Sequence, residues 1–176
     1  VPIGVLQQHT ITFEPELPGQ KLQAIDSLGL GLSETLFLKF PEAFWPQEPT
    51  VILRASERKN YFPLFFNNHY PFTKDPILTA RIAGSRVPEY NKLSDDDAVQ
   101  SVIDVLRTGF GSDIPWPSAS LRSHWLDDPF TACSYSTIKT GVPSQRYRLD
   151  IAAPLHNRLH FAGEHTSEDR FSTVHG

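Results

Sequence analysis

The residues with the clearest chemical potential lie near the C-terminal end, where positions 158–167 read RLHFAGEHTS. A short, mostly apolar run that stops at Gly163 predicts a buried strand entering a tight turn. The turn exposes the carboxylate of Glu164 and the hydroxyl of Thr166. A carboxylate at a strand end, beside a glycine that allows close approach, suits hydrogen bonding to the hydroxyls of a sugar-like chain. A strand-turn with a capping glutamate is the alternative.

Metal and thiol chemistry have less support. The seven histidines include His156, His160 and His165, but no H-E-x-x-H or Cys/His spacing accompanies them, so no metal site is predicted. Cys133 with His124 as its base would be a nucleophilic pair only because both residues are present, and structural roles are expected for both.

A Gly-rich phosphate-binding turn is also missing from the sequence. The fragment Gly29-Leu30-Gly31 follows a helix-like segment instead of a strand and lacks the third glycine of G-x-G-x-x-G. This fragment therefore does not predict dinucleotide binding by itself.

Three separated motifs resemble one known family. Residues 161–167 (FAGEHTS), followed by residues 173–176 (TVHG), closely resemble the C-terminal flavin-binding signature of the flavin-dependent amine oxidases. That superfamily includes polyamine oxidases, monoamine oxidases and flavin-type lysine demethylases. Residues 1–6 (VPIGVL), with FEPELP and KLQAI after them, resemble the opening of the family's substrate domain. Residues 125–130 (WLDDPF), then Ser134-Tyr135-Ser136, resemble the segment that brings an aromatic wall to the flavin.

The resemblance implies a mixed α/β (α+β) fold, the C-terminal part of a two-domain FAD-dependent amine oxidase. A mixed-sheet substrate lobe would be joined to the closing strand and turn of a dinucleotide-binding domain. Residues 1–18 would be a connector of the FAD-binding domain, residues 19–126 the substrate-binding domain, and residues 127–176 the C-terminal part of the FAD-binding domain. The N-terminal Gly-rich half would be a partner outside this sequence, and the chain alone is expected to be inactive and not to retain FAD.

The implied reaction oxidises an amine C–N bond to an imine, with hydride transfer to FAD and reoxidation by O2 to hydrogen peroxide. Trp125 and Tyr135 would lie beside the flavin, with Tyr135 as one wall of an aromatic slot that delivers the uncharged amine. Thr173 would form the opposite wall. Because it is small, it favours secondary amines in long chains, such as polyamines or an N-methylated lysine, over compact primary amines.

Cofactor contacts are implied for four positions besides Trp125. Gly163 would allow close approach, Glu164 would bind the sugar-like chain, and the backbone of Thr173 and Val174 would face the flavin ring. Thr35 is a departure from the family, which usually places a lysine there to hold a water against the flavin N5. The Thr35 hydroxyl could hold that water directly.

Periodicity and capping signals predict the elements that position these residues. A helix is expected over 19–29 and another from the capping residue Ser94 to Gly109, with Asp97 closing a capping box. Strands or strand-like runs are expected over 1–6, 35–40, 51–53, 77–83 and 121–125. A polar stretch is expected to run through Arg148.

Composition sets the remaining limits. The 176 residues are 39% hydrophobic and carry a net charge of −4, with acidic and basic residues interspersed. This charge pattern does not indicate binding to nucleic acid or to a membrane surface. No apolar run reaches the ~18 residues of a membrane span and no signal peptide is visible, so the compartment stays unknown. The alternative to an enzyme is a degenerate relative without flavin chemistry that binds a ligand or partner.

Overall fold

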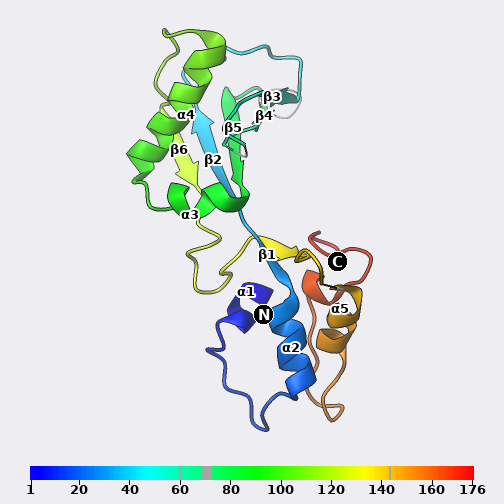
Figure 1. The fold of residues 1–176 in the computed structure, drawn as a ribbon. Helices are drawn as coiled ribbons and strands as arrows, with labels where there is room; N and C mark the ends of the chain where they lie inside the picture. Colours follow the sequence, from blue (N-terminus) through cyan, green and yellow to red (C-terminus); the bar gives the residue numbers. More distant parts are fainter. Residues whose placement is uncertain (60, 69–72, 143) are drawn as a thin grey trace. The chain divides into compact units, whose positions relative to one another are not determined.

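The computed structural model describes residues 1–59, 61–68, 73–142 and 144–176, which form two compact units (Figure 1). Unit 1 comprises Val1–Leu32 and Trp125–Gly176, and unit 2 comprises Ser33–His124. The predicted substrate-binding range, 19–126, begins earlier than unit 2. Which of these ranges binds cofactor and which binds substrate stays a prediction.

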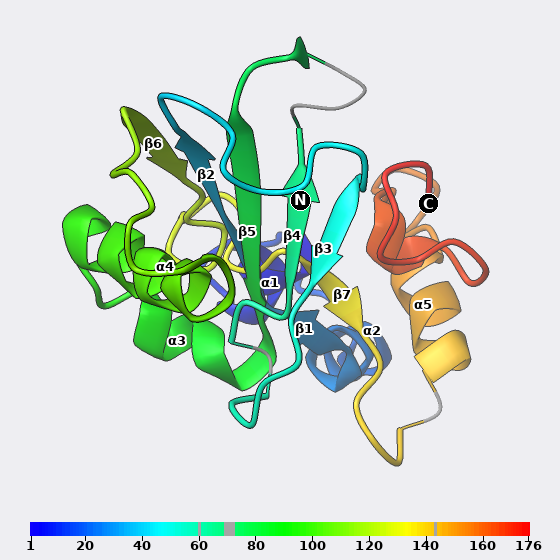
Figure 2. The same ribbon diagram turned by 90° about the horizontal axis from the view of Figure 1, so that it is seen from above.

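Unit 2 is built on a five-stranded antiparallel sheet with two helices on one face (Figures 1 and 2). The helices are α3 (Val87–Tyr90) and α4 (Asp95–Phe110), and a short 3-10 turn, η2 (Gly84–Arg86), precedes α3. In spatial order the strands are β3 (Val51–Leu53), β4 (Leu64–Asn67), β5 (Ile77–Ala83), β2 (Ser33–Lys39) and β6 (Ala119–Arg122). Mixed helix and sheet were predicted, and this part of the prediction is confirmed.

The alternation in β2 explains its place in the sheet. Leu36 and Leu38 are buried, whereas Phe37 and Lys39 are exposed, as the period of two predicts. Helix α4 begins where its capping signal predicts, since Ser94 Oγ accepts a hydrogen bond from Asp97 N at 3.1 Å. The helix continues to Phe110, beyond the predicted end.

Unit 1 packs three helices around a two-stranded ribbon. The helices are α1 (Ile3–Gln7), α2 (Gly19–Ser27) and α5 (Ser144–Ala152), and the ribbon pairs β1 (Gly29–Gly31) with β7 (Tyr135–Thr137). A 3-10 turn, η3 (Glu164–Thr166), follows. The buried core of this unit consists of Ile3, Leu6, Leu17, Ala24, Ile25, Leu28, Cys133 and Ile151.

Two expectations for unit 1 are wrong. The run over 1–6 forms helix α1 because Ile3 and Leu6, three residues apart, fall on one buried helical face. Residues 158–162 are not a strand, since within the described residues only an isolated bridge from Leu155 to Leu159 occurs there. The polar stretch through Arg148, for which no helix or strand was predicted, forms helix α5.

Lys21 ties α2 to the end of α5. Its ammonium donates to the carbonyl oxygens of Asp150, Ile151 and Ala153 at 2.7 to 2.8 Å, which uses all three of its protons. These carbonyls belong to the C-terminal turn of α5, where carbonyl oxygens lack partners within the helix. The same ammonium lies 4.7 Å from the ring centre of Phe161, just before the Gly163 turn. Lys21 therefore anchors the helix pair and the segment that leads into the turn.

Lys21→Met is expected to lower the free energy of unfolding by about 2 to 4 kcal/mol, because it leaves three carbonyls without their charged donor. Denaturant titration measures the change. Lys139→Met is the matched control, since Lys139 also donates to a carbonyl, that of Asp26 at 2.6 Å, but is exposed. Its loss should change stability by no more than about 0.5 kcal/mol. Equal effects for the two variants would contradict the anchoring role.

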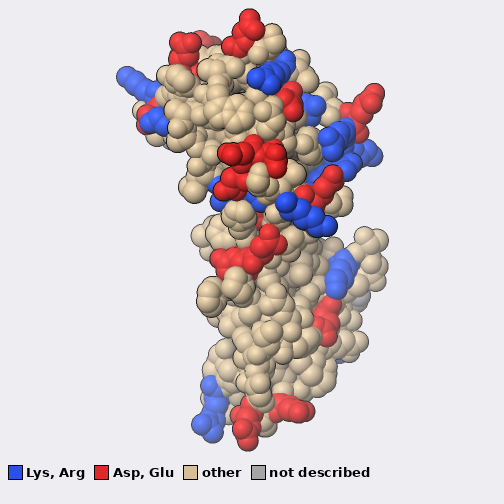
Figure 3. Space-filling view, turned by 90° about the vertical axis from the view of Figure 1, so that its left-hand side faces the viewer, with Lys and Arg blue, Asp and Glu red and all other residues tan. Residues whose placement is uncertain are grey.

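The surface carries both charge signs. On the face in Figure 3, basic and acidic side chains lie next to one another, as the interspersed sequence suggests. Among helices of the described residues, none has both the length and the apolar composition of a membrane span.

Candidate cofactor and substrate site

A cavity of about 330 Å³ in unit 1 brings together four of the predicted site residues. Trp125, Tyr135, Gly163 and Glu164 all line it, although they come from segments up to 39 positions apart in the chain. The remaining wall is formed by Val1, Pro2, Ile3, Thr131, Cys133, Ser134, Ala162 and His165. Two aromatic residues, an acidic residue and a glycine from the predicted set therefore line one cavity.

Glu164 is held by three hydrogen bonds from two serines. Its Oε1 accepts from the backbone N–H of Ser136 at 2.8 Å. Its Oε2 accepts from the Ser136 hydroxyl at 2.7 Å and from the backbone N–H of Ser172 at 2.6 Å. A carboxylate has about four acceptor positions, so one remains for a ligand. Gly163 precedes it with a φ of 141°, where a side chain would be strained, and the His165 ring lies against the place where a Cβ would be.

The ring of Tyr135 lies against Gly31 on the neighbouring strand. The ribbon register pairs Gly31 with Tyr135 and Leu30 with Ser136. Because side chains alternate along a strand, Tyr135 and Ser136 point to opposite faces. A Cβ added at Gly31 would overlap the Cε2 and Cδ2 atoms of the Tyr135 ring. Gly31 is thus the platform on which the ring rests, a role that differs from the phosphate-binding turn considered above.

Gly31→Ala is expected to displace the Tyr135 ring and lower stability by about 1 to 3 kcal/mol, as overpacking of a tight site does. Thermal unfolding and a structure of the variant measure both effects. The control is Gly19→Ala, because no atom lies within 4 Å of a Cβ at Gly19 and the position is helical. That change should be neutral or slightly stabilising. An unmoved ring in Gly31→Ala would refute the platform role.

Trp125 and Cys133 complete the cavity in different ways. Trp125 is 48% exposed, and its carbonyl accepts a hydrogen bond from Thr131 Oγ1 at 2.6 Å. Cys133 is buried, and burial raises the pKa of its thiol. A thiolate nucleophile needs the opposite shift, so Cys133 acts as an apolar wall residue. Within the described residues no group of His, Cys, Asp and Glu is arranged to hold a metal ion.

His165 is the buried imidazole of the site. It is 2% exposed, its carbonyl accepts from Arg148 Nη1 at 3.2 Å, and its Nε2 has no partner among the described residues. Burial lowers the pKa of His165, the Glu164 carboxylate opposes that shift, and the Arg148 guanidinium adds to it. The imidazole is therefore neutral at neutral pH.

His165 gives the protein an acid-sensitive stability. Its folded-state pKa lies below its ordinary value of 6.5, so the unfolded chain binds the proton first as pH falls. The free energy of unfolding is expected to be fully retained above pH 6.5 and to decline below it, by at most about 1.4 kcal/mol per pH unit for one proton. Urea titrations across this range test it. His165→Gln should flatten the decline, and an identical slope in both proteins would exclude His165 as its source.

Three predicted site residues lie outside this cavity. Thr173 and Val174 are exposed, and Thr173 Oγ1 donates to the carbonyl of Arg170 within its own loop. Thr35 belongs to unit 2, where it lies on β2 and its N–H donates to Ser123 Oγ at 2.8 Å. The proposed contacts of these three residues with substrate or flavin stay predictions.

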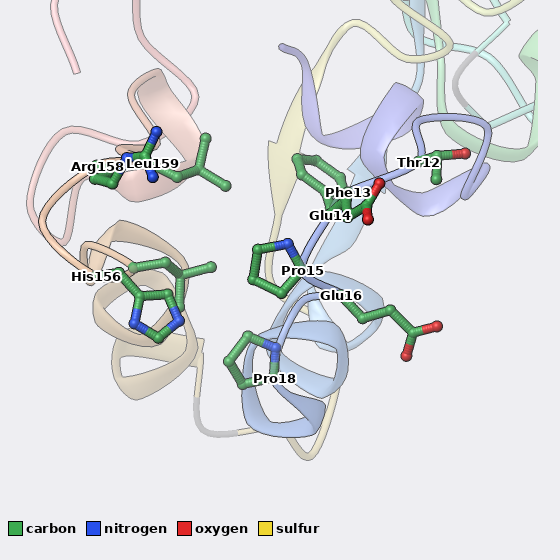
Figure 4. A pocket seen from close by; sticks show the side chains of 10 residues that line it. Thr12, Phe13, Glu14, Pro15, Glu16, Pro18, His156, Arg158 and Leu159 are labelled. Atoms are coloured by element: carbon green, nitrogen blue, oxygen red, sulfur yellow. The ribbon is translucent and has the colours of Figure 1, made fainter.

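A larger cavity lies elsewhere in unit 1, and none of the predicted residues lines it. It measures about 430 Å³ and lies between the segments 12–18 and 155–159. In Figure 4 the rings of Phe13, Pro15 and Pro18 face His156 and Leu159 across it. The carboxylate of Glu16 points away from that space. Its lining combines polar and charged residues with apolar ones, but no residue predicted to contact cofactor or substrate lies on it, so volume alone does not make it the better cofactor site.

Comparison with known families decides the affiliation. The family model described as "Flavin containing amine oxidoreductase" matches residues 1–176. The chain belongs to this family. Among curated members of the flavin amine oxidoreductases, it is 38% identical over its whole length to "Polyamine oxidase 5" of Oryza sativa subsp. japonica, covering 35% of that protein. It is 34% identical over 99% of its length to "Lysine-specific histone demethylase 1 homolog 2" of the same organism, covering 24%.

Solved structures share the fold. Cyclohexylamine oxidase from Brevibacterium oxydans IH-35A superimposes with a TM-score of 0.75 at 19% identity, over 96% of this chain and 37% of that one. Putrescine oxidase bound to putrescine gives 0.78 at 20% identity, over 97% and 37%. The predicted fold class and family are confirmed. The chain spans between about a quarter and just over a third of the length of these flavin amine oxidoreductases.

A flavin cofactor follows from this family, and the cavity offers groups that fit part of one. Glu164 retains an acceptor position, Gly163 is exposed, and Trp125 and Tyr135 supply flat aromatic rings. The cavity volume of about 330 Å³ accommodates a portion of a dinucleotide. A carboxylate acceptor beside aromatic rings suits a ligand that carries a hydroxyl-bearing chain next to a flat ring system.

Sequence reasoning missed the residues that hold Glu164. Ser136 was recognised only as a neighbour of Tyr135, because no strand was predicted there and its strand pairing is visible only in the structure. Arg148 was assigned to a polar stretch because an apolar-periodicity test overlooks a buried arginine. Its spacing of three from Ile151, which is also fully buried, is the signal of a shared helical face.

Proposed function

We propose that this chain forms cofactor contacts and one wall of the amine slot in an FAD-dependent amine oxidase of polyamine oxidase type. FAD, when bound, supplies the two-electron acceptor that takes hydride from the amine carbon, leaving an imine, and that passes the electrons to O2 to give hydrogen peroxide. The observation that carries the proposal is the shared cavity wall of Glu164, Gly163, Tyr135 and Trp125.

The site residues would have different roles in binding the cofactor and the amine. Glu164 would accept a hydrogen bond from a hydroxyl of the cofactor's sugar-like chain, at the acceptor position that Ser136 and Ser172 leave open. Tyr135 and Trp125 would exclude water and orient the amine, since aromatic faces tolerate a cation on entry and a dry slot favours the uncharged nitrogen. Thr173, as a small wall residue, would leave room for a secondary amine in a long chain.

A polyamine is the preferred substrate class. The likeness to a rice polyamine oxidase, at 38% identity, and to putrescine oxidase in fold supports it. A methylated lysine side chain is the alternative substrate, because this chain is 34% identical to a lysine-specific histone demethylase homologue.

Mixing the flavin-loaded, full-length protein with a polyamine in the absence of oxygen tests the proposal. Loss of the flavin's visible absorbance, and its return when O2 is admitted, is the expected result. Flavin that stays oxidised with both polyamines and methylated lysine peptides would reject amine oxidation.

A second candidate is a relative that binds a ligand without flavin chemistry. Thr35 favours it, since the family usually places a lysine at that position. Purified full-length protein with no flavin absorbance, and none gained on adding FAD, would support this candidate over the first.

A further inference from the structure

Arg148 is a fully buried cation in unit 1. It lies on α5 with none of its surface exposed, and no carboxylate among the described residues pairs with it directly. Its Nη1 donates to Ser136 Oγ at 2.8 Å and to the carbonyl of His165 at 3.2 Å. Its face lies 4.0 Å from the ring centre of Phe171. Burying a guanidinium is unfavourable, and an apolar side chain would fill the same space more easily.

The hydrogen bonds of Arg148 set the direction of the Ser136 hydroxyl. A guanidinium has donors and no acceptor, so Ser136 Oγ must accept from Arg148. The single hydroxyl proton is then left for Glu164 Oε2, 2.7 Å away. The Ser136 backbone N–H holds the other oxygen, Oε1, at 2.8 Å. Ser136 thereby clamps both oxygens of the carboxylate, and Arg148 orients the clamp.

Ser136 itself is fixed in place. It is fully buried on β7, and its carbonyl accepts a hydrogen bond from the Ser172 hydroxyl. Ser172 also gives its N–H to Glu164. Rotation of the Glu164 carboxylate would break bonds to both serines, so its remaining acceptor position keeps one direction. That direction matters because Glu164 lines the cavity, whereas Arg148 and Ser136 are not among its lining residues.

We infer that Arg148 is a positioning residue for the cofactor, acting through Ser136 to hold the Glu164 carboxylate in the orientation that binds a cofactor hydroxyl. The inference rests on the proposed function, in which Glu164 contacts FAD. Arg148 would thus contribute to the affinity for the cofactor although it does not line the cavity. Preorganised acceptors bind more tightly because the entropy of fixing them is already lost before the ligand arrives.

A double-mutant cycle on FAD affinity tests the relay. The dissociation constant of the full-length protein for FAD is measured by flavin fluorescence for Arg148→Met, Ser136→Ala and the double variant. Each single change is expected to weaken binding about 5- to 10-fold, which corresponds to one lost hydrogen bond in the relay. The double variant should bind no more weakly than Ser136→Ala alone, because Arg148 acts only through the hydroxyl.

Two further variants separate positioning from folding. Arg146→Met removes an exposed arginine of the same helix, with 80% of its side chain accessible, and should leave the FAD affinity unchanged. Arg148→Lys keeps a charged donor and should recover part of the affinity that Arg148→Met loses. If Arg148→Met does not fold, Arg148→Lys takes its place in the cycle, and its loss of affinity should also vanish in the Ser136→Ala background.

The outcomes are distinct. Additive losses in the double variant, or a lowered melting temperature with unchanged FAD affinity, overturn the relay and make Arg148 a folding residue. Failure of the unaltered full-length protein to bind FAD overturns the proposed function, and this inference with it. FAD binding together with additive losses overturns this inference alone.

Discussion

Tyr135→Ala is expected to lower kcat/KM for a polyamine by about 10- to 100-fold in the full-length enzyme, with little change in FAD content. The ring stands on Gly31 and lines the cavity with Trp125, so its removal opens one wall of the amine slot. The loss corresponds to about 1 to 3 kcal/mol of transition-state stabilisation from orientation. Steady-state kinetics and flavin absorbance measure the two quantities.

Two controls define the origin of that effect. Tyr135→Phe keeps the ring and should retain most of the activity, because the wall needs the flat face. Phe130→Ala removes an aromatic residue of the same segment that is 81% exposed and does not line the cavity, and should leave kcat/KM unchanged. Unaltered kinetics in Tyr135→Ala would remove the residue from the amine slot.

Glu164→Ala is expected to weaken FAD binding by about 10- to 100-fold. The change removes the acceptor for a cofactor hydroxyl and also leaves the N–H groups of Ser136 and Ser172 without their partner. Losing a charged hydrogen bond corresponds to about 1.5 to 3 kcal/mol, which gives that range of affinity. Equilibrium titration of the full-length protein with FAD measures it.

The matched control is Glu168→Ala, an exposed carboxylate four residues further along the same loop. Its FAD affinity should equal that of the unaltered protein. Glu164→Gln keeps the shape and one carbonyl acceptor, so it should fall between the two. If Glu164→Ala and Glu168→Ala bind FAD equally well, Glu164 serves only to cap its turn, which is the simpler role that the sequence also allows.

Elements with a local signal were predictable from the sequence. The alternation along β2 and the capping serine of α4 report burial and backbone pairing through neighbours a few residues away. The strand predicted over 158–162 was wrong because apolar content predicts burial of a segment but not a neighbouring strand to pair with. Helix α5 was missed because its buried face includes Arg148, which a hydropathy pattern counts as exposed.

In the site, too, the sequence predicted some residues and not others. The family resemblance predicted Trp125, Tyr135, Gly163 and Glu164 as site residues. The fold brings all four to one cavity. The contact of Tyr135 with Gly31 depends on pairing between strands more than 100 positions apart. The hydrogen bonds behind Glu164 depend on Arg148, which lies 12 positions from Ser136 and outside every motif. A motif identifies the residues that touch a ligand, whereas the residues behind them follow from three-dimensional packing.

The most direct test of the account is the structure of the full-length protein with FAD bound. We expect a cofactor hydroxyl within about 3.2 Å of a Glu164 carboxylate oxygen, with the Ser136 hydrogen bonds to that carboxylate still in place. We also expect the Tyr135 ring on Gly31 beside the flavin. A cofactor whose hydroxyls all lie beyond hydrogen-bonding distance of Glu164, with that carboxylate bonded only to Ser136 and Ser172, would contradict the account.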